Sequence, residues 1–330
     1  MTKLPIAVDA MGADRGPGEI VAGARQAAEE FGIPVVLVGH PDAIGDTGGL
    51  EVMPASEVIE MTDDAAAAIR RKRDSSVVKA AEAVRDGHVA AMVSAGNTGA
   101  AVASALLRMG RIRGVSRPAI ATTLPVPGSL PTVLLDSGAN AECQPAWVAQ
   151  FAQMGAVYTA SRFGIAEPRV GLLSIGEEDS KGTTLVKETR ALLAQPGFLD
   201  TSGGRFIGNV EGRDALTDGL DVMVTDGFTG NVLLKALEGG VKVVVNAVLE
   251  AMNTTDETRR AAEVLFPALM PLYHEMDPDT FGGAMLLGVD GVCIIGHGKS
   301  TQRAIVNAVR LAADMVEADL VGQLRDAVGR

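Results

Sequence analysis

The sequence predicts a Rossmann-like α/β/α fold, in which a mostly parallel sheet lies between two layers of helices. Short apolar runs of strand length alternate along the 330 residues with amphipathic stretches of helical period, a pattern typical of sheets buried on both faces. The 39 glycines suit many tight strand–helix turns, and the core is aliphatic because aromatic residues make up only 3%. No linker or fixed-period repeat is visible, so we expect a single domain over residues 1–330.

The strands are marked by apolar runs that end in small or polar residues. The first and the fourth of them end in an acid, Asp9 and Asp136. In parallel α/β sheets ligands lie at the carboxyl ends of the strands, so we expect the polar motifs to meet there. The expected strands are residues 6–9, 34–38, 89–93, 132–136, 169–175, 206–210, 222–225 and 291–295.

The helices are predicted from periodicity and capping residues. The first begins at Gly16, has one apolar face from Ile20 to Phe31, and ends at Gly32 as a left-handed cap. Ser75 or Ser76 caps the second. This second helix covers 77–85, and further helices are expected over 101–108, from 232 onward, and over 301–320 at the end of the chain.

Composition excludes several classes of function. A net charge of −12 argues against a nucleic-acid partner, because phosphate neutralisation dominates such binding. Two cysteines, Cys143 and Cys293, are too few for a disulfide framework or a zinc site. We expect neither a metal nor a cofactor. The N-terminus lacks a signal-peptide pattern, and no apolar run is long enough to span a bilayer, so we expect a cytoplasmic protein.

Two glycine-containing turns, Ser94–Ala100 and Asp226–Val232, each join an expected strand to an expected helix. Such a turn exposes backbone N–H groups, and the first turn of the helix adds unpaired donors and a positive dipole end. Both segments therefore predict an anion site, for phosphate above all.

Other glycine loops give weaker signals. No dinucleotide fingerprint follows the first strand, and the Gly296–Ser300 loop fails the P-loop spacing at Cys293. Lys181, in the loop that begins at Gly176, is a candidate anion ligand. Cys143 has no histidine near it in sequence, so we expect no covalent intermediate and direct reaction of two bound substrates. Of the four histidines, His297 alone lies in a loop suited to chemistry.

Two surface features remain open at this stage. Basic clusters at 70–73 and at 108–117 stand out on an acidic chain; they are either solvated helix ends or docking patches for an acidic partner. Residues 246–287 include the apolar, twice proline-containing segment Val264–Tyr273. This region is either a helix pair packed on the core or a dimer partner, or a surface that touches a bilayer without crossing it.

Several segments in a fixed order resemble the phosphate acyltransferase family of bacterial phospholipid synthesis (PlsX) along nearly the whole chain. Departures from the family pattern include Ser174 where Asn is usual and Lys299 where Ser is usual. The matching segments are Ile6–Gly12, Arg73–Ser76, Val93–Ala100, Arg117–Ala119, Leu134–Asn140, Gly171–Glu178, Gly208–Arg213, Asp226–Val232, Leu286–Gly291 and His297–Gly298.

The resemblance implies attack of inorganic phosphate on the thioester of a long-chain fatty acyl-acyl carrier protein, giving an acyl phosphate for glycerophospholipid synthesis. It also implies a phosphotransacetylase- and isocitrate/isopropylmalate dehydrogenase-like fold with a protruding helical segment at about 246–287. A homodimer and loose contact with the inner face of the cell membrane follow in the same way. A membrane glycerol-3-phosphate acyltransferase would take the product.

On this basis we assign roles to the motifs. Lys181, Asn231, His297 and Asp226 are the candidate catalytic residues, with Lys181 supplying positive charge and His297 protonating the departing thiolate. The candidate substrate-binding residues are Asp9, Asn97, Thr98, Gly99, Asp136, Asn140, Gly176, Glu177, Asn209, Thr229, Gly230 and Lys299. For carrier-protein docking they are Arg70, Arg71, Lys72, Arg73, Arg108 and Arg111. For membrane contact they are Leu265, Phe266, Leu269, Met270 and Leu272.

Two alternatives remain. One is a phosphotransacetylase-like enzyme that uses coenzyme A thioesters, which the anion loops alone do not exclude. The other is a non-catalytic membrane scaffold that binds acyl carrier protein. A scaffold has no need of so many polar motifs at strand ends.

Overall fold

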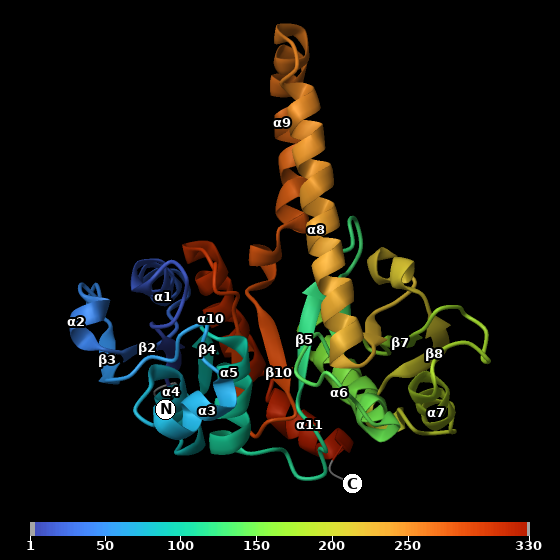
Figure 1. Cartoon of the computed structure of the whole chain (residues 1–330), viewed down its shortest axis with the longest axis horizontal. Helices are drawn as coiled ribbons and strands as arrows, with labels where there is room; N and C mark the ends of the chain where they lie inside the picture. The colour runs from blue at the N-terminus through green and yellow to red at the C-terminus, as the bar shows by residue number, and fades with distance from the viewer. Residues whose placement is uncertain (1–3, 329–330) are drawn as a thin grey trace.

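A single 11-stranded sheet forms the centre of the molecule in the computed structural model, which describes residues 4–328 (Figure 1). The strand order is β3-β2-β1-β4-β11-β10-β5-β6-β9-β7-β8. The strands are β1 (Ile6–Asp9), β2 (Val35–Gly39), β3 (Glu51–Pro54), β4 (Ala91–Ser94), β5 (Ala119–Leu124), β6 (Thr132–Leu135), β7 (Arg169–Leu173), β8 (Arg205–Val210), β9 (Val222–Val224), β10 (Ala284–Leu287) and β11 (Val292–Ile295).

The sheet consists of two parallel sets that run in opposite directions. Strands β1 to β4 and β11 are parallel to one another, and so are β6 to β9. Between them, β10 pairs antiparallel with β11 and with β5, and β5 pairs antiparallel with β6. Three reversals in a row leave the second set antiparallel to the first. Its carboxyl ends therefore lie at the opposite edge of the sheet.

Helices cover both faces, as the sequence predicts. The helices are α1 (Pro17–Phe31), α2 (Pro41–Ile44), α3 (Ala65–Arg71), α4 (Ser76–Arg85), α5 (Thr98–Ser104), α6 (Pro145–Phe163), α7 (Thr184–Leu193), α8 (Gly227–Met252), α9 (Asp256–Met276), α10 (Gln302–Glu317) and α11 (Leu320–Val328). A π-helical turn, η1 (Ala105–Met109), extends α5, and short 3-10 turns lie at η2 (Asp200–Ser202), η3 (Gly212–Leu216) and η4 (Pro278–Phe281).

Alternate residues of the strands face two different helix layers. Helices α1, α6, α10 and α11 bury Ile20, Phe151, Val309 and Leu324 against one face. On the other face, α3, α4 and α5 cover the first set of strands. There η3 and the first turns of α8 cover the second set. The expected three-layer, mostly parallel fold is confirmed.

Helices α8 and α9 form a hairpin that projects from the body of the molecule (Figure 1). Only the root of α8, up to Leu237, packs against the core. The protrusion therefore begins earlier than the predicted residue 246. It also ends earlier than 287, because Ala284–Leu287 is strand β10. A hairpin packed on the core, one of the readings above, is wrong. At about 1.5 Å per residue, the 21 residues of α9 extend over roughly 32 Å.

Other differences from the sequence prediction have local causes. The predicted helix over 301–320 is two helices, because Asp319 adopts a left-handed φ of 50° and accepts a hydrogen bond from the backbone N–H of Gly322. Phe31, expected on a buried face, is 39% exposed and lies under the guanidinium of Arg310. Strands β3, β5 and β10 and helices α2, α3, α6 and α7 were not anticipated. No helix among the described residues is long and apolar enough to cross a bilayer.

Candidate active site

The carboxyl ends of β6, β9, β7 and β8 lie side by side at one edge of the sheet. They carry the loop 136–140, the N-terminus of α8, the loop 174–182 and the segment that begins at Asn209. These four segments contain ten of the candidate catalytic and substrate-binding residues: Asp136, Asn140, Gly176, Glu177, Lys181, Asn209, Asp226, Thr229, Gly230 and Asn231.

Asp136 organises the first of these loops. Its side chain is fully buried, and Oδ1 accepts hydrogen bonds from the backbone N–H groups of Ile120 (3.0 Å), Gly138 (3.0 Å) and Ala139 (2.9 Å). Oδ2 accepts from the backbone N–H and the side-chain amide of Asn140, at 2.7 and 2.9 Å. Five donors fill the capacity of the carboxylate. Asp136 therefore holds the loop in place and is not available as a base.

Asp226 caps helix α8. Its two oxygens accept hydrogen bonds from the backbone N–H and the hydroxyl of Thr229, both at 2.8 Å. This arrangement uses the hydroxyl proton of Thr229, so Thr229 does not donate it to a substrate. Asn231, one turn further on, donates one amide hydrogen to the carbonyl of Ser137 at 3.2 Å. Its second amide hydrogen remains to be donated.

Helix α8 approaches the Asp136 loop closely because two of its residues are glycines. A Cβ on Gly230 would lie 2.0 Å from the carbonyl oxygen of Asp136, and one on Gly227 would lie 2.5 Å from that of Asn140. The backbone N–H of Gly227 donates to the same Asn140 carbonyl at 2.8 Å. The N-terminus of α8, the positive end of its dipole, is thereby fixed against the loop.

The end of β7 presents a cation beside unsatisfied polar atoms. Within the described part of the chain, Lys181 is exposed and has no carboxylate in ion-pair range. Ser174 Oγ and Asn209 Oδ1 are buried without a hydrogen-bond partner among the described residues, although Asn209 Nδ2 donates to the Glu178 carbonyl at 3.0 Å. A buried polar atom without a partner costs about 1–3 kcal/mol.

The remaining candidates belong to a second group at the carboxyl ends of β1, β4 and β11. Asp9 accepts hydrogen bonds from Ser94 Oγ (2.7 Å) and Met11 N–H (3.1 Å), and burial raises its pKa. Thr98, Gly99, His297 and Lys299 are exposed at this edge. From β11 to β9 there are four strand spacings, roughly 19 Å along the sheet. The expectation that all polar motifs share one edge is wrong, because strand direction reverses between the two sets.

Two consequences follow for the assigned roles. Asn97 caps α5 through its Oδ1, and its Nδ2 donates to the carbonyls of Glu60, Met61 and Asp63. No donor of its side chain is left for phosphate. His297, whose Nδ1 accepts the backbone N–H of Lys299 at 3.2 Å, lies with this second group. The geometry does not place it where it could protonate a thiolate beside Lys181.

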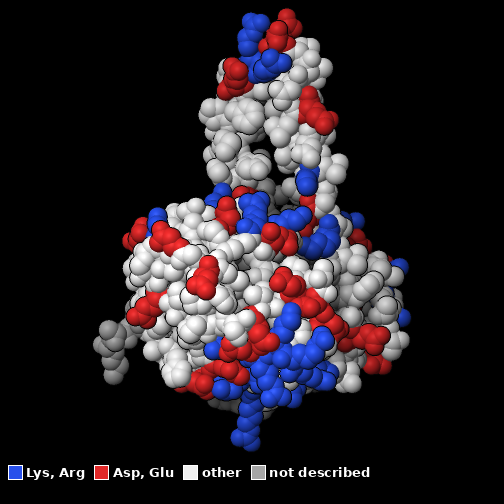
Figure 2. All heavy atoms as spheres, turned by 60° about the vertical axis from the view of Figure 1, so that its left-hand side comes forward, with Lys and Arg blue, Asp and Glu red and all other residues white. Residues whose placement is uncertain are grey.

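The basic clusters are only partly free. Lys72 donates to Asp63 (2.6 Å) and to the carbonyl of Val58 (2.7 Å), so it is a structural residue. Arg108 pairs with Glu82 at 3.4 Å. Arg70, Arg71, Arg73 and Arg111 remain exposed. Figure 2 shows Lys and Arg side chains gathered toward the bottom of the face on which α3 and α4 lie.

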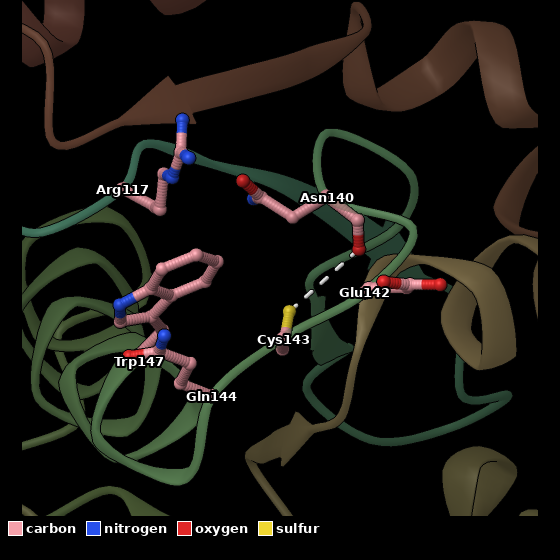
Figure 3. A pocket seen from close by; sticks show the side chains of 6 residues that line it. All are labelled: Arg117, Asn140, Glu142, Cys143, Gln144 and Trp147. Atoms are coloured by element: carbon pink, nitrogen blue, oxygen red, sulfur yellow. Dashed lines mark hydrogen bonds between the residues drawn. The ribbon is translucent and has the colours of Figure 1, made fainter.

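A pocket beside the Asp136 loop was missed from the sequence. Arg117, Asn140, Glu142, Cys143, Gln144 and Trp147 line it (Figure 3). Arg117 and Trp147 are 30 positions apart, and no local motif joins them. The guanidinium of Arg117 lies 4.8 Å from the centre of the Trp147 ring.

Solved structures that share this fold include phosphotransacetylases and a dehydrogenase. A phosphotransacetylase from Streptococcus pyogenes superposes with a TM-score of 0.63 at 17% identity over 96% of this chain and 95% of its own. The EutD phosphotransacetylase from Staphylococcus aureus gives 0.61 at 15% identity, over 95% and 94%. A 4-hydroxythreonine-4-phosphate dehydrogenase from Klebsiella pneumoniae gives 0.53 at 13%, over 95% and 100%. The chain therefore shares the α/β fold of these phosphotransacetylases and of this dehydrogenase.

Sequence relatives narrow this class to one family. Residues 4–323 match the family described as "Fatty acid synthesis protein". A protein from Pelotomaculum thermopropionicum named phosphate acyltransferase is 45% identical, covering 98% of this chain and 95% of its own length. One of the same name from Nostoc sp. is 44% identical, over 98% and 96%. The chain belongs to the fatty acid synthesis protein family and is an acyltransferase.

Proposed function

We propose that the chain transfers a long-chain fatty acyl group from acyl-acyl carrier protein to inorganic phosphate. The observation that carries this proposal is the site at the ends of β6 to β9. There, among the described residues, Lys181 has no ion-pair partner and the loop also holds two buried polar atoms without hydrogen-bond partners. The name phosphate acyltransferase, carried by relatives 42–45% identical to the chain, supports phosphate as the acceptor.

The site suits hydrogen phosphate in particular. Lys181 and the hydroxyl of Ser174 would donate to phosphate oxygens. Asn209 Oδ1 is an acceptor only, so it would take the P–OH hydrogen. The second amide hydrogen of Asn231 and the N-terminus of α8 would stabilise the oxyanion that forms on the thioester carbonyl.

The reaction needs no further reactant. An oxygen of hydrogen phosphate forms a bond to the thioester carbon, the C–S bond breaks, and the sulfur leaves with the electron pair. The proton of hydrogen phosphate ends on that sulfur as a thiol, which leaves acyl phosphate. Phosphate is a competent nucleophile and a thiolate leaves readily, so the protein chiefly positions the reactants and stabilises charge.

Release of carrier-protein thiol from palmitoyl-acyl carrier protein, with and without phosphate, tests the proposal. Palmitoyl-coenzyme A and acetyl-coenzyme A are compared in parallel, and enzyme-only controls correct for Cys143 and Cys293. Phosphate-dependent release from the carrier thioester supports the proposal. Turnover of acetyl-coenzyme A alone would replace it with a phosphotransacetylase, and carrier binding without turnover would indicate a scaffold.

Substitutions locate the chemistry. Lys181→Ala and Asn231→Ala should each lose about 100-fold or more in kcat, as removal of an oxyanion donor does. Lys187→Ala is the matched control, because this exposed lysine lies on α7. Normal turnover in both site variants, with the fold intact, would overturn the assignment.

The exposed part of the basic cluster is proposed as the dock for the acidic carrier protein. Reversing the charges of Arg70, Arg71 and Arg73 should raise KM for the carrier substrate and leave kcat unchanged. Lys72 is left intact because its ion pair is structural. An unchanged KM would exclude this patch.

The α8–α9 hairpin is proposed as the contact with the inner face of the cell membrane and with a second copy of the chain. There the acyl phosphate would pass to a membrane glycerol-3-phosphate acyltransferase for glycerophospholipid synthesis. Leu265, Phe266, Leu269, Met270 and Leu272 are each 37–53% exposed, and Figure 2 shows a largely uncharged shaft with charged side chains at its tip. Contiguous exposed apolar surface marks an interface.

Leu265→Glu and Phe266→Glu separate the two contacts of the hairpin. Loss of liposome co-sedimentation in the variants would support the membrane contact, and a shift from dimer to monomer in analytical ultracentrifugation would support the second copy. Retention of both would refute the proposed role of these residues.

A further inference from the structure

Two adjoining recesses lie beside the candidate active site and share Arg117 and Trp147. The first, of about 460 Å³, is the pocket of Figure 3. The second, of about 610 Å³, is completed by Leu106, Leu107, Arg111 and Ser116. Their lining residues come from η1, the segment 111–117, the loop 136–144 and the first turn of α6, and the two shared residues make this double recess one depression. Of its lining residues, Asn140 was predicted to bind substrate and Arg111 to dock the carrier protein, whereas Trp147, Gln144 and Cys143 were given no binding role.

The first recess borders the machinery at the N-terminus of α8. Asn140, in its wall, bonds through its side chain to Asp136 Oδ2 (2.9 Å) and to the Pro118 carbonyl (2.8 Å). Its own carbonyl accepts the N–H of Gly227 and the thiol of Cys143. The wall of the recess and the root of α8 are therefore one hydrogen-bonded unit.

Cys143 lies between the recess and the carboxylates of the site. Burial is the main cause that raises its pKa to about 11, and the nearby charges of Asp136 and Asp226 raise it further, while Arg117 opposes them. The thiol is therefore neutral at physiological pH and is a poor nucleophile. It forms a small apolar part of the wall between Arg117 and the N-terminus of α8.

The functional groups in the depression suit a ligand that carries both a phosphate and amides. Arg117 and Arg111 are exposed, and no carboxylate within the described ranges forms an ion pair with either. Figure 3 shows the side chain of Glu142 pointing away from Arg117 and Trp147, and the amide of Asn140 turned toward them. The exposed amide of Gln144 offers both a donor and an acceptor, and guanidinium groups are suited to phosphate oxygens.

We propose that this double recess binds the phosphopantetheine arm of the acyl donor, with its phosphate at Arg111 and Arg117. The amides of the arm lie against Asn140 and Gln144, and its thioester passes Cys143 toward the N-terminus of α8. The inference rests on the proposed function for the identity of the donor. Carrier protein and coenzyme A both carry this arm, so the recess recognises the chemistry that they share.

The test uses the single tryptophan of the chain as a reporter, because Trp147 lines both recesses. Its fluorescence is followed while 4′-phosphopantetheine, pantetheine without the phosphate, coenzyme A, holo-carrier protein or inorganic phosphate is added. Phosphopantetheine should give a saturable change. Pantetheine should bind at least about tenfold more weakly, the loss expected for one charge-assisted hydrogen bond. Comparing coenzyme A with carrier protein shows which source of the arm is preferred.

Arg117→Gln should weaken phosphopantetheine binding by at least about tenfold and raise KM for the acyl donor without changing KM for phosphate. Arg113→Gln is the matched control, since Arg113 is exposed in the same segment but lines neither recess. Equal binding of pantetheine and phosphopantetheine, an identical response to inorganic phosphate alone, or unchanged affinity in Arg117→Gln would each overturn the inference.

The binding experiment and the turnover experiment can refute the recess and the proposed reaction independently of each other. Phosphate-dependent thiol release with a silent Trp147 and an unchanged KM in Arg117→Gln would refute the recess and leave the proposed reaction standing. Saturable binding of phosphopantetheine without phosphate-dependent release would support the recess as a site and refute the proposed reaction.

Discussion

The contact between Gly230 and the Asp136 loop predicts that the same substitution has opposite effects at two positions of α8. In Gly230→Ala the new Cβ would lie 2.0 Å from the Asp136 carbonyl oxygen and 3.0 Å from its carbon. Both are backbone atoms of a loop held by five hydrogen bonds to the Asp136 carboxylate. Neither atom can yield as the end of a flexible side chain would.

The magnitude follows from two opposing effects. Overpacking costs about 1–3 kcal/mol, and a contact between backbone atoms belongs at the upper end, about 3 kcal/mol. Alanine gains about 1 kcal/mol over glycine inside a helix. The net destabilisation is therefore about 2 kcal/mol. At about 2 °C per kcal/mol for a chain of this size, Tm should fall by about 4 °C.

Gly239→Ala is the matched control on the same helix. Nothing lies within 4 Å of the Cβ that it would add, so only the helix-propensity gain remains and Tm should rise by about 2 °C. Thermal unfolding followed by circular dichroism measures both variants under one set of conditions. Equal Tm values for the two would refute the packing of α8 against the Asp136 loop.

Three further predictions concern single side chains. The Ser56 hydroxyl is the main cause that lowers the pKa of Asp74 to about 2, so ionised Asp74 stabilises the fold above pH 3.8 and this stabilisation is lost as pH falls toward 2. Asp74→Asn should therefore lower Tm at pH 6, and the difference in Tm from the unsubstituted chain should close as pH falls below 3.8. A Tm difference that does not depend on pH would contradict a role of the Asp74 charge. Cys143 should react slowly with iodoacetamide at pH 8 and faster toward pH 11. Fully buried Cys293 should stay unmodified while the chain is folded. Rapid labelling of Cys143 at pH 7, measured by mass spectrometry, would be inconsistent with its burial. Lys72→Ala should lower the urea midpoint of unfolding without changing KM for the carrier, because the Lys72–Asp63 pair is structural. A change in KM alone would return Lys72 to the docking patch.

The sequence predicted the layers of the fold but not the direction of its strands. The runs that end at Asp9 and at Asp136 have the same local pattern, an apolar strand followed by an acid, yet β1 and β6 are antiparallel across the sheet. Direction depends on the reversals at β10 and β5, which are set by long-range pairing and leave no trace in hydropathy. For this reason His297 was assigned to the same site as Lys181.

Residue type also fails to separate structural from chemical roles. Asn97 and Asn231 occur in similar Gly-Asn-Thr and Thr-Gly-Asn contexts. Asn97 accepts the capping hydrogen bond through Oδ1 and donates its amide hydrogens to loop carbonyls, whereas Asn231 donates one amide hydrogen to the Ser137 carbonyl and has no second acceptor among the described residues. Hydrogen-bond saturation becomes visible only when the partners are placed. The Arg117–Trp147 pair was missed for a similar reason, because a cation near an aromatic ring 30 positions away has no signature in the sequence.

Helix α8 begins at the candidate site and ends at the turn of the hairpin without interruption. Its 26 residues form a rod of roughly 39 Å, and the Gly230 contact fixes one end of that rod. A tilt of about 5° about this pivot would move the far end by about 3 Å but the first turn by well under 1 Å. A displacement of the hairpin tip of that size would therefore leave the N-terminus of α8 in place against the Asp136 loop.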